Sequence, residues 1–278
     1  MQSNLDEKTV EGFGEEWARF SQAELDEREL AEQFDRYFSV FPWESLPKDA
    51  EGFDLGCGSG RWAKLAAKKI GKLHCIDASS AALAVARRNL EGLDNVEFHE
   101  ASVDSIPLSD GSMDFGYSLG VLHHIPDTEA GLKACVAKLR PGAPFLVYLY
   151  YAFDNRPGWF RGVWRVSDVG RRAVASLPFG AKKVVTDVIA FSVYLPLSTL
   201  ALILEKAGMR VDTVPLSVYR RHSIYTMRTD ALDRFGTRLE QRFTREQIRE
   251  MMERAGLTNI QFSENDPYWC AVGFKGVE

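Results

Sequence analysis

The sequence contains little cysteine, no excess of basic residues and no N-terminal signal pattern. Its four cysteines among 278 residues show neither metal-ligand nor disulfide spacing, so we expect no metal site and a reducing compartment. The net charge of −5, from 34 basic and 39 acidic residues, argues against a general nucleic-acid-binding protein. The first residues lack the basic and apolar segments of a secretory signal, which indicates a cytoplasmic protein.

Residues 51–150 alternate between short apolar strands and helices. Such alternation predicts an α/β fold with a mostly parallel sheet, right-handed crossovers and helices on both faces. Thr244 and Gln247 have the spacing of a capping box, and the helix that they open precedes two further strands. We therefore divide the chain into a core of residues 51–150 and 244–278, an N-terminal helical lid of residues 1–50 and an insertion of residues 151–243.

The end of the first predicted strand carries three glycines at alternate positions, Gly56, Gly58 and Gly60. Glycine lets the backbone approach a ligand closely and adopt dihedral angles that a Cβ atom forbids. The second strand ends at Asp77, which can accept hydrogen bonds from both ribose hydroxyls of an adenosine-containing cofactor. Asp54 would repel a pyrophosphate, but its charge suits a cationic or amine-bearing ligand. The two strand ends therefore predict an adenosine pocket at the carboxyl edge of the sheet.

The segment Asp-Leu-Gly-Cys-Gly-Ser-Gly at residues 54–60, with Asp77 in register, resembles the first motif of class I S-adenosylmethionine-dependent methyltransferases. The resemblance extends to the ubiquinone–menaquinone type, which acts on small molecules. It implies a Rossmann-like seven-stranded fold, S-adenosyl-L-methionine as cofactor, and methyl transfer to a small-molecule or lipid-like acceptor by O-, N- or C-methylation. It assigns the cofactor site to Asp54, Gly56, Cys57, Gly58, Gly60, Asp77, Ala78, Ser102, Val103 and Leu119.

Two other functions remain open from the sequence. A nicotinamide-dependent oxidoreductase would use the pattern G-x-G-x-x-G, and Arg61 occupies the place of its third glycine. A catalytically silent, S-adenosylmethionine-binding partner subunit would keep the same glycine loop and Asp77. Cofactor titration separates the first alternative from a methyltransferase, and only turnover separates the second.

Residues 122–127, Leu-His-His-Ile-Pro-Asp, resemble the segment that passes beside the methyl donor in small-molecule O-methyltransferases. In some relatives the first histidine is a general base, so His123 is the catalytic candidate, with a cofactor-lining or structural role as the alternative. The acid that assists this histidine in sugar enzymes corresponds to Leu149, which leaves the pair incomplete. At the adenine segment, Ser102 stands where the family commonly has an acid, and Asp104 is the substitute.

Aromatic and basic side chains elsewhere are the candidates for the acceptor site. Phe13, Trp17 and Phe20 share one face of a predicted helix, which either packs on the core or covers the cofactor with Trp17. The tyrosines and bases of residues 219–225 line a substrate site or form a solvated surface. The predicted substrate contacts are Trp17, His124, Tyr150, Tyr151, Tyr219, Arg220, His222 and Tyr225.

The insertion combines a basic stretch with a long uncharged run. Basic residues dominate positions 156–183, and residues 188–204 carry no charge. The uncharged run has the composition of a buried cap helix, a lipid-facing element or a transmembrane span. We expect the insertion to select a hydrophobic or anionic small-molecule acceptor, with peripheral membrane contact through residues 156–204. The oligomeric state stays open.

Overall fold

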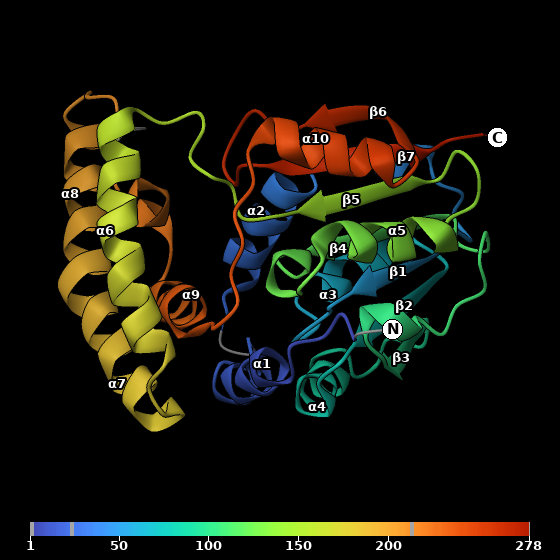
Figure 1. Cartoon of the computed structure of the whole chain (residues 1–278), viewed down its shortest axis with the longest axis horizontal. Coiled ribbons are helices and arrows are strands. Elements are labelled where there is room, and N and C mark those ends of the chain that lie inside the picture. Colours follow the sequence, from blue (N-terminus) through green and yellow to red (C-terminus); the bar gives the residue numbers. More distant parts are fainter. Residues whose placement is uncertain (1–2, 23–24, 212–213, 278) are drawn as a thin grey trace. The chain divides into compact units, whose positions relative to one another are not determined.

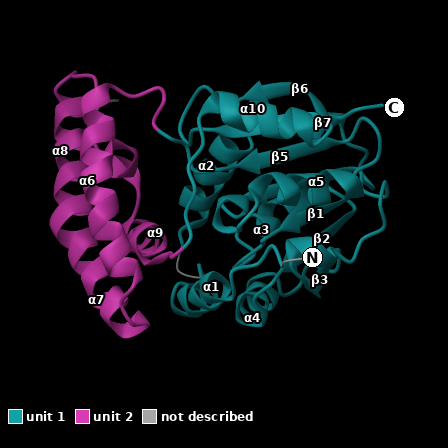
Figure 2. Cartoon of the chain, viewed as in Figure 1, with its two compact units in different colours: residues 1–152, 239–278 teal, residues 153–238 magenta. Residues whose placement is uncertain are grey.

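The computed structural model describes residues 3–22, 25–211 and 214–277. The chain divides into two compact units, coloured separately in Figure 2. Unit 1 consists of residues 1–152 and 239–278, and unit 2 of residues 153–238. Unit 1 therefore includes residues 239–243, which the sequence pattern assigned to the insertion.

Unit 1 is built around a seven-stranded sheet with the strand order β3-β2-β1-β4-β5-β7-β6 (Figure 1). The first five strands are parallel, and β7 runs antiparallel to both of its neighbours. This order confirms the predicted Rossmann-like α/β fold. The strands are β1 (Glu51–Leu55), β2 (Lys72–Asp77), β3 (Val96–Glu100), β4 (Phe115–Leu119), β5 (Pro144–Tyr148), β6 (Leu257–Phe262) and β7 (Cys270–Lys275).

Helices lie on both faces of this sheet (Figure 1). Ser79 begins α4 by accepting a hydrogen bond from the Ala82 amide, and the capping box of Thr244 and Gln247 begins α10. The helix after the glycine loop, α3, is short, because the chain changes to a 3₁₀ turn at Ala67. The helices of unit 1 are α1 (Glu7–Arg19), α2 (Glu27–Tyr37), α3 (Ala63–Ala66), α4 (Ser80–Asn89), α5 (Thr128–Lys138) and α10 (Arg245–Arg254).

The core of unit 1 holds the motif strands in place. Strands β1, β4 and β5 are buried along nearly their whole length, as expected for parallel strands that are covered on both faces. Phe53 of β1 and Phe145 of β5 are fully buried, and their ring centroids lie 6.0 Å apart. A rigid central sheet fixes the positions of the loops at its carboxyl edge, where ligands bind in this class of fold.

Unit 2 is helical within its described residues. Its helices are α6 (Gly158–Ala175), α7 (Phe179–Ile189), α8 (Leu195–Lys206) and α9 (Ile224–Gly236). A π-helical segment, Ala190–Tyr194, joins α7 to α8, so that Phe179–Lys206 is one continuous helical stretch. By length and composition this stretch could cross a membrane, and only 22% of its most apolar window is buried.

Unit 2 buries a charged pair beside a small apolar core, and many of its other apolar side chains lie on its surface. Buried Asp168 and Arg171 form an ion pair of 2.7 Å, and Arg228 pairs with Asp187 at 2.9 Å between α9 and α7. We call the exposed apolar residues of α6 and of the Phe179–Lys206 stretch the exposed apolar set. The set comprises Trp159, Val163, Val166, Val169, Val184, Val188, Phe191, Val193, Leu200 and Ile203.

Candidate functional site

The glycine loop follows β1 directly and has the backbone conformation that glycine permits. Gly56, Gly58 and Gly60 have φ angles of +76°, +54° and +77°. The amides of Gly56 and Cys57 donate to the carbonyl oxygen of Ile76, which ties the loop to the end of β2. A Cβ atom at Gly56 would lie 2.3 Å from a methyl group of Val121, so a side chain has no room there.

Asp77 lies at the end of β2 and faces the glycine loop. Its two carboxylate oxygens accept hydrogen bonds of 2.9 Å from the amides of Gly58 and Ser79. Burial raises the pKa of Asp77, and these backbone hydrogen bonds oppose the shift. Each carboxylate oxygen has a second lone pair, so the side chain can also accept from two ligand hydroxyls.

Asp54 is a buried acid beneath the same loop. Its side chain is 1% exposed, and Oδ2 has no hydrogen-bond partner among the described residues. Burial raises the pKa of Asp54 to about 8, against smaller lowering effects of Tyr117 and Arg61. The hydroxyl of Ser59 is also buried without a partner within the part of the chain that the structure describes. Unpartnered buried polar atoms are uncommon in folded proteins, so their gathering here indicates a ligand site.

The loops after β3 and β4 form the neighbouring parts of the carboxyl edge. Ser102 precedes the 3₁₀ turn Val103–Ser105, and Val103 is buried. Leu119 ends β4 and is also buried. Asp104 instead accepts a 2.6 Å hydrogen bond from the backbone amide of Asn4, so the suggested substitute for the adenine acid binds the N-terminal segment.

The N-terminal helix α1 lies along this edge. Gly58 has room only for hydrogen, because a Cβ atom there would lie 2.9 Å from Nε1 of Trp17. Further along the helix, the ring of Phe13 lies 5.0 Å from that of His124. The Asn4 side chain exchanges two hydrogen bonds with the backbone of Asp127. The helix therefore contacts both the glycine loop and the histidine segment.

His123 is fully buried and stacks on Tyr150, with ring centroids 3.9 Å apart. Neither of its ring nitrogens has a hydrogen-bond partner among the described residues. Burial, together with His124 and Arg242, holds the pKa of His123 well below its ordinary value. The imidazole is therefore neutral near pH 7 and able to accept a proton from an acceptor that comes within reach.

Residues 239–243 complete the surroundings of this histidine. The amide of Gln241 donates to the His123 carbonyl oxygen, and the Leu239 carbonyl oxygen lies 2.6 Å from Nδ1 of His124. Arg242 pairs with buried Glu240 at 2.8 Å, and its guanidinium carbon lies 5.1 Å from the centre of the Tyr150 ring. The sequence pattern missed these residues, because only the capping box that follows them gave a signal.

The predicted substrate residues of the insertion have contacts within unit 2. The Tyr219 hydroxyl donates to Asp230, and Arg220 pairs with Glu205 at 2.8 Å. The ring of His222 lies 5.7 Å from that of Tyr219. Their substrate role and that of Tyr225 stay predictions, as do those of Trp17, His124, Tyr150 and Tyr151 in unit 1.

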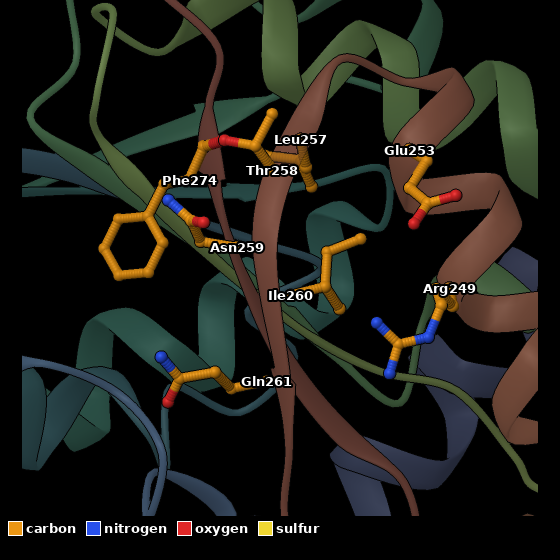
Figure 3. Close-up of a pocket in the computed structure, with 8 residues that line it drawn as sticks. All are labelled: Arg249, Glu253, Leu257, Thr258, Asn259, Ile260, Gln261 and Phe274. Atoms are coloured by element: carbon orange, nitrogen blue, oxygen red, sulfur yellow. The ribbon is translucent and has the colours of Figure 1, made fainter.

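An open depression lies elsewhere on unit 1, at the β6 edge of the sheet (Figure 3). Strand β6 is the edge strand farthest from β3 in the sheet, and none of the motif residues lines the depression. Its lining residues are Arg249, Glu253, Leu257, Thr258, Asn259, Ile260, Gln261 and Phe274.

Comparison with known proteins places the glycine loop in a recognised domain. Residues 53–142 match the family model described as a methyltransferase domain. An uncharacterized 37.1 kDa protein from a Streptomyces fradiae transposon is 37% identical over 92 residues, covering 32% of this chain and 27% of that protein. The ubiquinone biosynthesis O-methyltransferase of Xanthomonas axonopodis pv. citri is 27% identical over 62% of this chain and 68% of the enzyme.

The chain spans only about a quarter of the length of the first two curated relatives that it matches. Among solved structures, a chain from the complex of the Haloferax volcanii Trm112 methyltransferase activator has a TM-score of 0.52 at 15% identity. It covers 99% of this chain and 100% of that one, which supports the fold. The domain match, the strand order and the glycine loop with Asp77 identify residues 53–142 as similar to a methyltransferase domain on a Rossmann-like fold.

Proposed function

We propose that the protein transfers a methyl group from S-adenosylmethionine to a small-molecule or lipid-like acceptor. The observation that carries this proposal is the glycine loop whose Gly58 amide is bound by Asp77 at 2.9 Å. A silent partner subunit is the alternative. A nicotinamide enzyme is less favoured, because Arg61 replaces the third glycine of that pattern.

The residues of the loop suit this cofactor in charge as well as in shape. Asp77 would hold the ribose hydroxyls, and the glycines leave space where side chains would block the ligand. The unpartnered Oδ2 of Asp54 would face the positively charged amino group of the methionine part, whose charge would favour ionisation of this buried carboxyl group. When bound, the cofactor supplies a methyl group already activated by the sulfonium charge. The protein then has mainly to align the acceptor with it.

His123 is the proposed general base for a hydroxyl or carbon acid. Its neutral imidazole would remove the proton of the acceptor, and Arg242 near Tyr150 would favour an acceptor that becomes negative. An amine or thiolate acceptor would need little base catalysis, and His123 would then line the site. O-, N- and C-methylation therefore remain open.

The exposed apolar set supports a hydrophobic acceptor and a membrane surface as the partner of unit 2. On α6, Trp159, Val163 and Val166 follow helical spacing, as do Val184, Val188 and Phe191 on the longer helix. Side chains of this kind are costly in water and suit the acyl region of a bilayer. We therefore propose a cytoplasmic protein that docks peripherally, with the helices lying in the interface.

Charge favours an anionic bilayer over an apolar protein partner. Exposed basic residues are interspersed with the exposed apolar set: Arg161, Arg165, Arg172 and Lys183. Basic residues near an anionic leaflet contribute about 1 kcal/mol each. The Xanthomonas relative is named as an enzyme of ubiquinone biosynthesis, which is consistent with a lipid-like acceptor.

Turnover tests the proposed function. The protein is incubated with S-adenosylmethionine carrying a radiolabelled methyl group and with lipid and aqueous extracts of bacterial cells. We expect label in an organic-soluble product, and loss of that label in an Asp77→Ala variant. Tight binding of the cofactor without transfer to any extract would favour the silent partner subunit. Binding of a nicotinamide cofactor instead would overturn the proposal.

A further inference from the structure

A cluster of titratable side chains lies on β1, β2 and β3, apart from the glycine loop. The parallel register places His74 of β2 opposite Glu97 of β3. His99 follows Glu97 by two residues, so both side chains are on the same face of β3. Glu51, at the start of β1, joins them through a contact with His74.

The three nearest groups converge on one point. Nδ1 of His74 lies 2.9 Å from Nε2 of His99. Carboxylate oxygens of Glu97 lie 3.7 Å from His99 Nε2 and 3.8 Å from His74 Nδ1. All of these ligand atoms are within 4.8 Å of one another. In a tetrahedral zinc site, bonds of about 2.0–2.1 Å place the ligand atoms roughly 3.3 Å apart. The observed distances scatter around that value.

Glu51 determines which nitrogen of His74 is free for a ligand. Its Oε1 atom lies 2.7 Å from His74 Nε2 and has no proton to donate when ionised, so that nitrogen donates. Nδ1 of His74 then carries a lone pair, and His99 must supply the proton between the two rings. A metal ion would replace this single proton. A carboxylate behind a ligating histidine is the usual second sphere of such sites.

We propose that His74 Nδ1, His99 Nε2 and Glu97 Oε1 bind a divalent transition-metal ion of the zinc class. Glu51 orients His74, and water completes the coordination. Two imidazoles and one carboxylate suit zinc better than calcium or magnesium, which prefer oxygen ligands. The ion would fasten the edge strand β3 to β2, the strand that ends at Asp77.

Lys72 is the opposing charge in this cluster. Its ammonium group lies 2.9 Å from Oε2 of Glu97 and 3.3 Å from Glu51. The Oε1 atom of Glu97 faces His99 instead, which leaves it available to the ion while Oε2 stays with Lys72. Removing the lysine charge should therefore raise the affinity for the metal ion. If the cluster is only a salt-bridge network, the same substitution should create no metal affinity.

Calorimetry of the chelator-treated full chain with Zn²⁺, and visible absorption with Co²⁺, test the site. We expect saturable binding to one site and the strong absorption of tetrahedral Co²⁺ in the wild type. His99→Ala should abolish both signals, and Glu51→Gln should weaken affinity roughly ten- to hundredfold. Lys72→Met should raise affinity.

Glu100→Gln is the matched control, because Glu100 is exposed on the same strand but on its opposite face. It should bind Zn²⁺ as tightly as the wild type. Melting curves establish that each variant is folded, and Glu97→Gln provides a second, exposed ligand variant that is expected to weaken binding. Absence of a Co²⁺ spectrum in the wild type, or unchanged Zn²⁺ affinity in both His99→Ala and Glu97→Gln, would overturn the proposal.

Discussion

Asp54 combines complete burial with an unpartnered carboxylate oxygen. In solution an aspartate ionises near pH 3.9, whereas burial raises the pKa of Asp54 in the folded protein to about 8. Between these two pH values the folded protein therefore holds a proton that the unfolded chain has already released. Because the folded state binds more protons, its stability declines as the pH rises through this window, by at most about 1.4 kcal/mol per pH unit.

We predict that Asp54→Asn removes this part of the pH dependence. An amide does not ionise, so the melting temperature of the variant should fall less than that of the wild type between pH 6 and pH 8. Thermal melts in the absence of cofactor measure the difference. Asp110→Asn is the control, because Lys138 keeps the pKa of Asp110 low. Identical pH dependence in Asp54→Asn and the wild type would contradict the account.

His123 offers a prediction about catalysis. His123→Phe preserves a ring against Tyr150 but removes both nitrogens. For a hydroxyl acceptor, turnover should fall about 10²–10⁴-fold, while the affinity for S-adenosylhomocysteine stays nearly unchanged. Steady-state kinetics and calorimetry separate the two effects. Full turnover in this variant would assign His123 a lining role and point to an amine or thiol acceptor.

Among the helices of unit 1, α1 contacts the glycine loop through Trp17. Phe13 and Asn4, which precedes α1, instead reach His124 and Asp127 of the histidine segment. The sequence predicted the helix and its apolar face from the spacing of Phe13, Trp17 and Phe20. The sequence did not predict the contact of Asn4 with Asp127, because a single polar residue belongs to no periodic pattern that would indicate its partner.

Two glycines of α1 allow a matched test of its role as a lid. A Cβ atom at Gly14 would lie 2.7 Å from Oγ of Ser79, whereas one at Gly12 meets nothing within 4 Å. We predict that Gly14→Ala displaces the helix and speeds cofactor release. Gly12→Ala should leave release unchanged and stabilise the helix by up to about 1 kcal/mol. Stopped-flow fluorescence measures release, and equal rates in the two variants would exclude the lid.

Strand register explains why the proposed metal site could not be found in the sequence. Metal motifs are recognised when their ligands recur at short fixed spacing, as in zinc fingers. His74 and His99 are far apart in the chain and come together only because β2 and β3 pair in parallel. The glycine loop and Asp77 were predictable for the opposite reason, since strand, loop and helix follow each other locally.

At the scale of the whole molecule, the alternation of strands and helices was sufficient to predict the core, and the insertion was not predictable in detail. The apolar run of residues 188–204 permitted a buried cap helix. Val188, Phe191 and Ile203 are instead at least half exposed. The charged pair of Asp168 and Arg171 is buried in unit 2, where Arg171 also donates to the carbonyl oxygen of Thr237. The polarity of the interior depends on tertiary pairing, which hydropathy alone does not show.

We predict that the protein floats with anionic vesicles at low salt. The double variant Phe191→Asp and Ile203→Asp places charge in the exposed apolar set and should abolish flotation. Ile224→Asp, at an exposed position on α9 outside that set, is the control and should still float. High salt should weaken binding by screening the basic residues. A wild-type protein that floats with neither anionic nor neutral vesicles, and is monodisperse without detergent, would exclude the membrane surface.

Calorimetry of Asp77→Ala tests whether Asp77 and the glycine loop bind S-adenosylmethionine. Charge-assisted hydrogen bonds contribute about 1.5–3 kcal/mol each, so removal of the carboxylate should weaken affinity for S-adenosylmethionine and S-adenosylhomocysteine at least about tenfold. Asp110→Ala is the control, because Asp110 is an exposed acid that pairs with Lys138 at the C-terminal end of α5. This variant should bind S-adenosylmethionine and S-adenosylhomocysteine as the wild type does. We expect this difference, together with no binding of NAD to either protein. Equal cofactor affinity in Asp77→Ala and the wild type would contradict the proposed site.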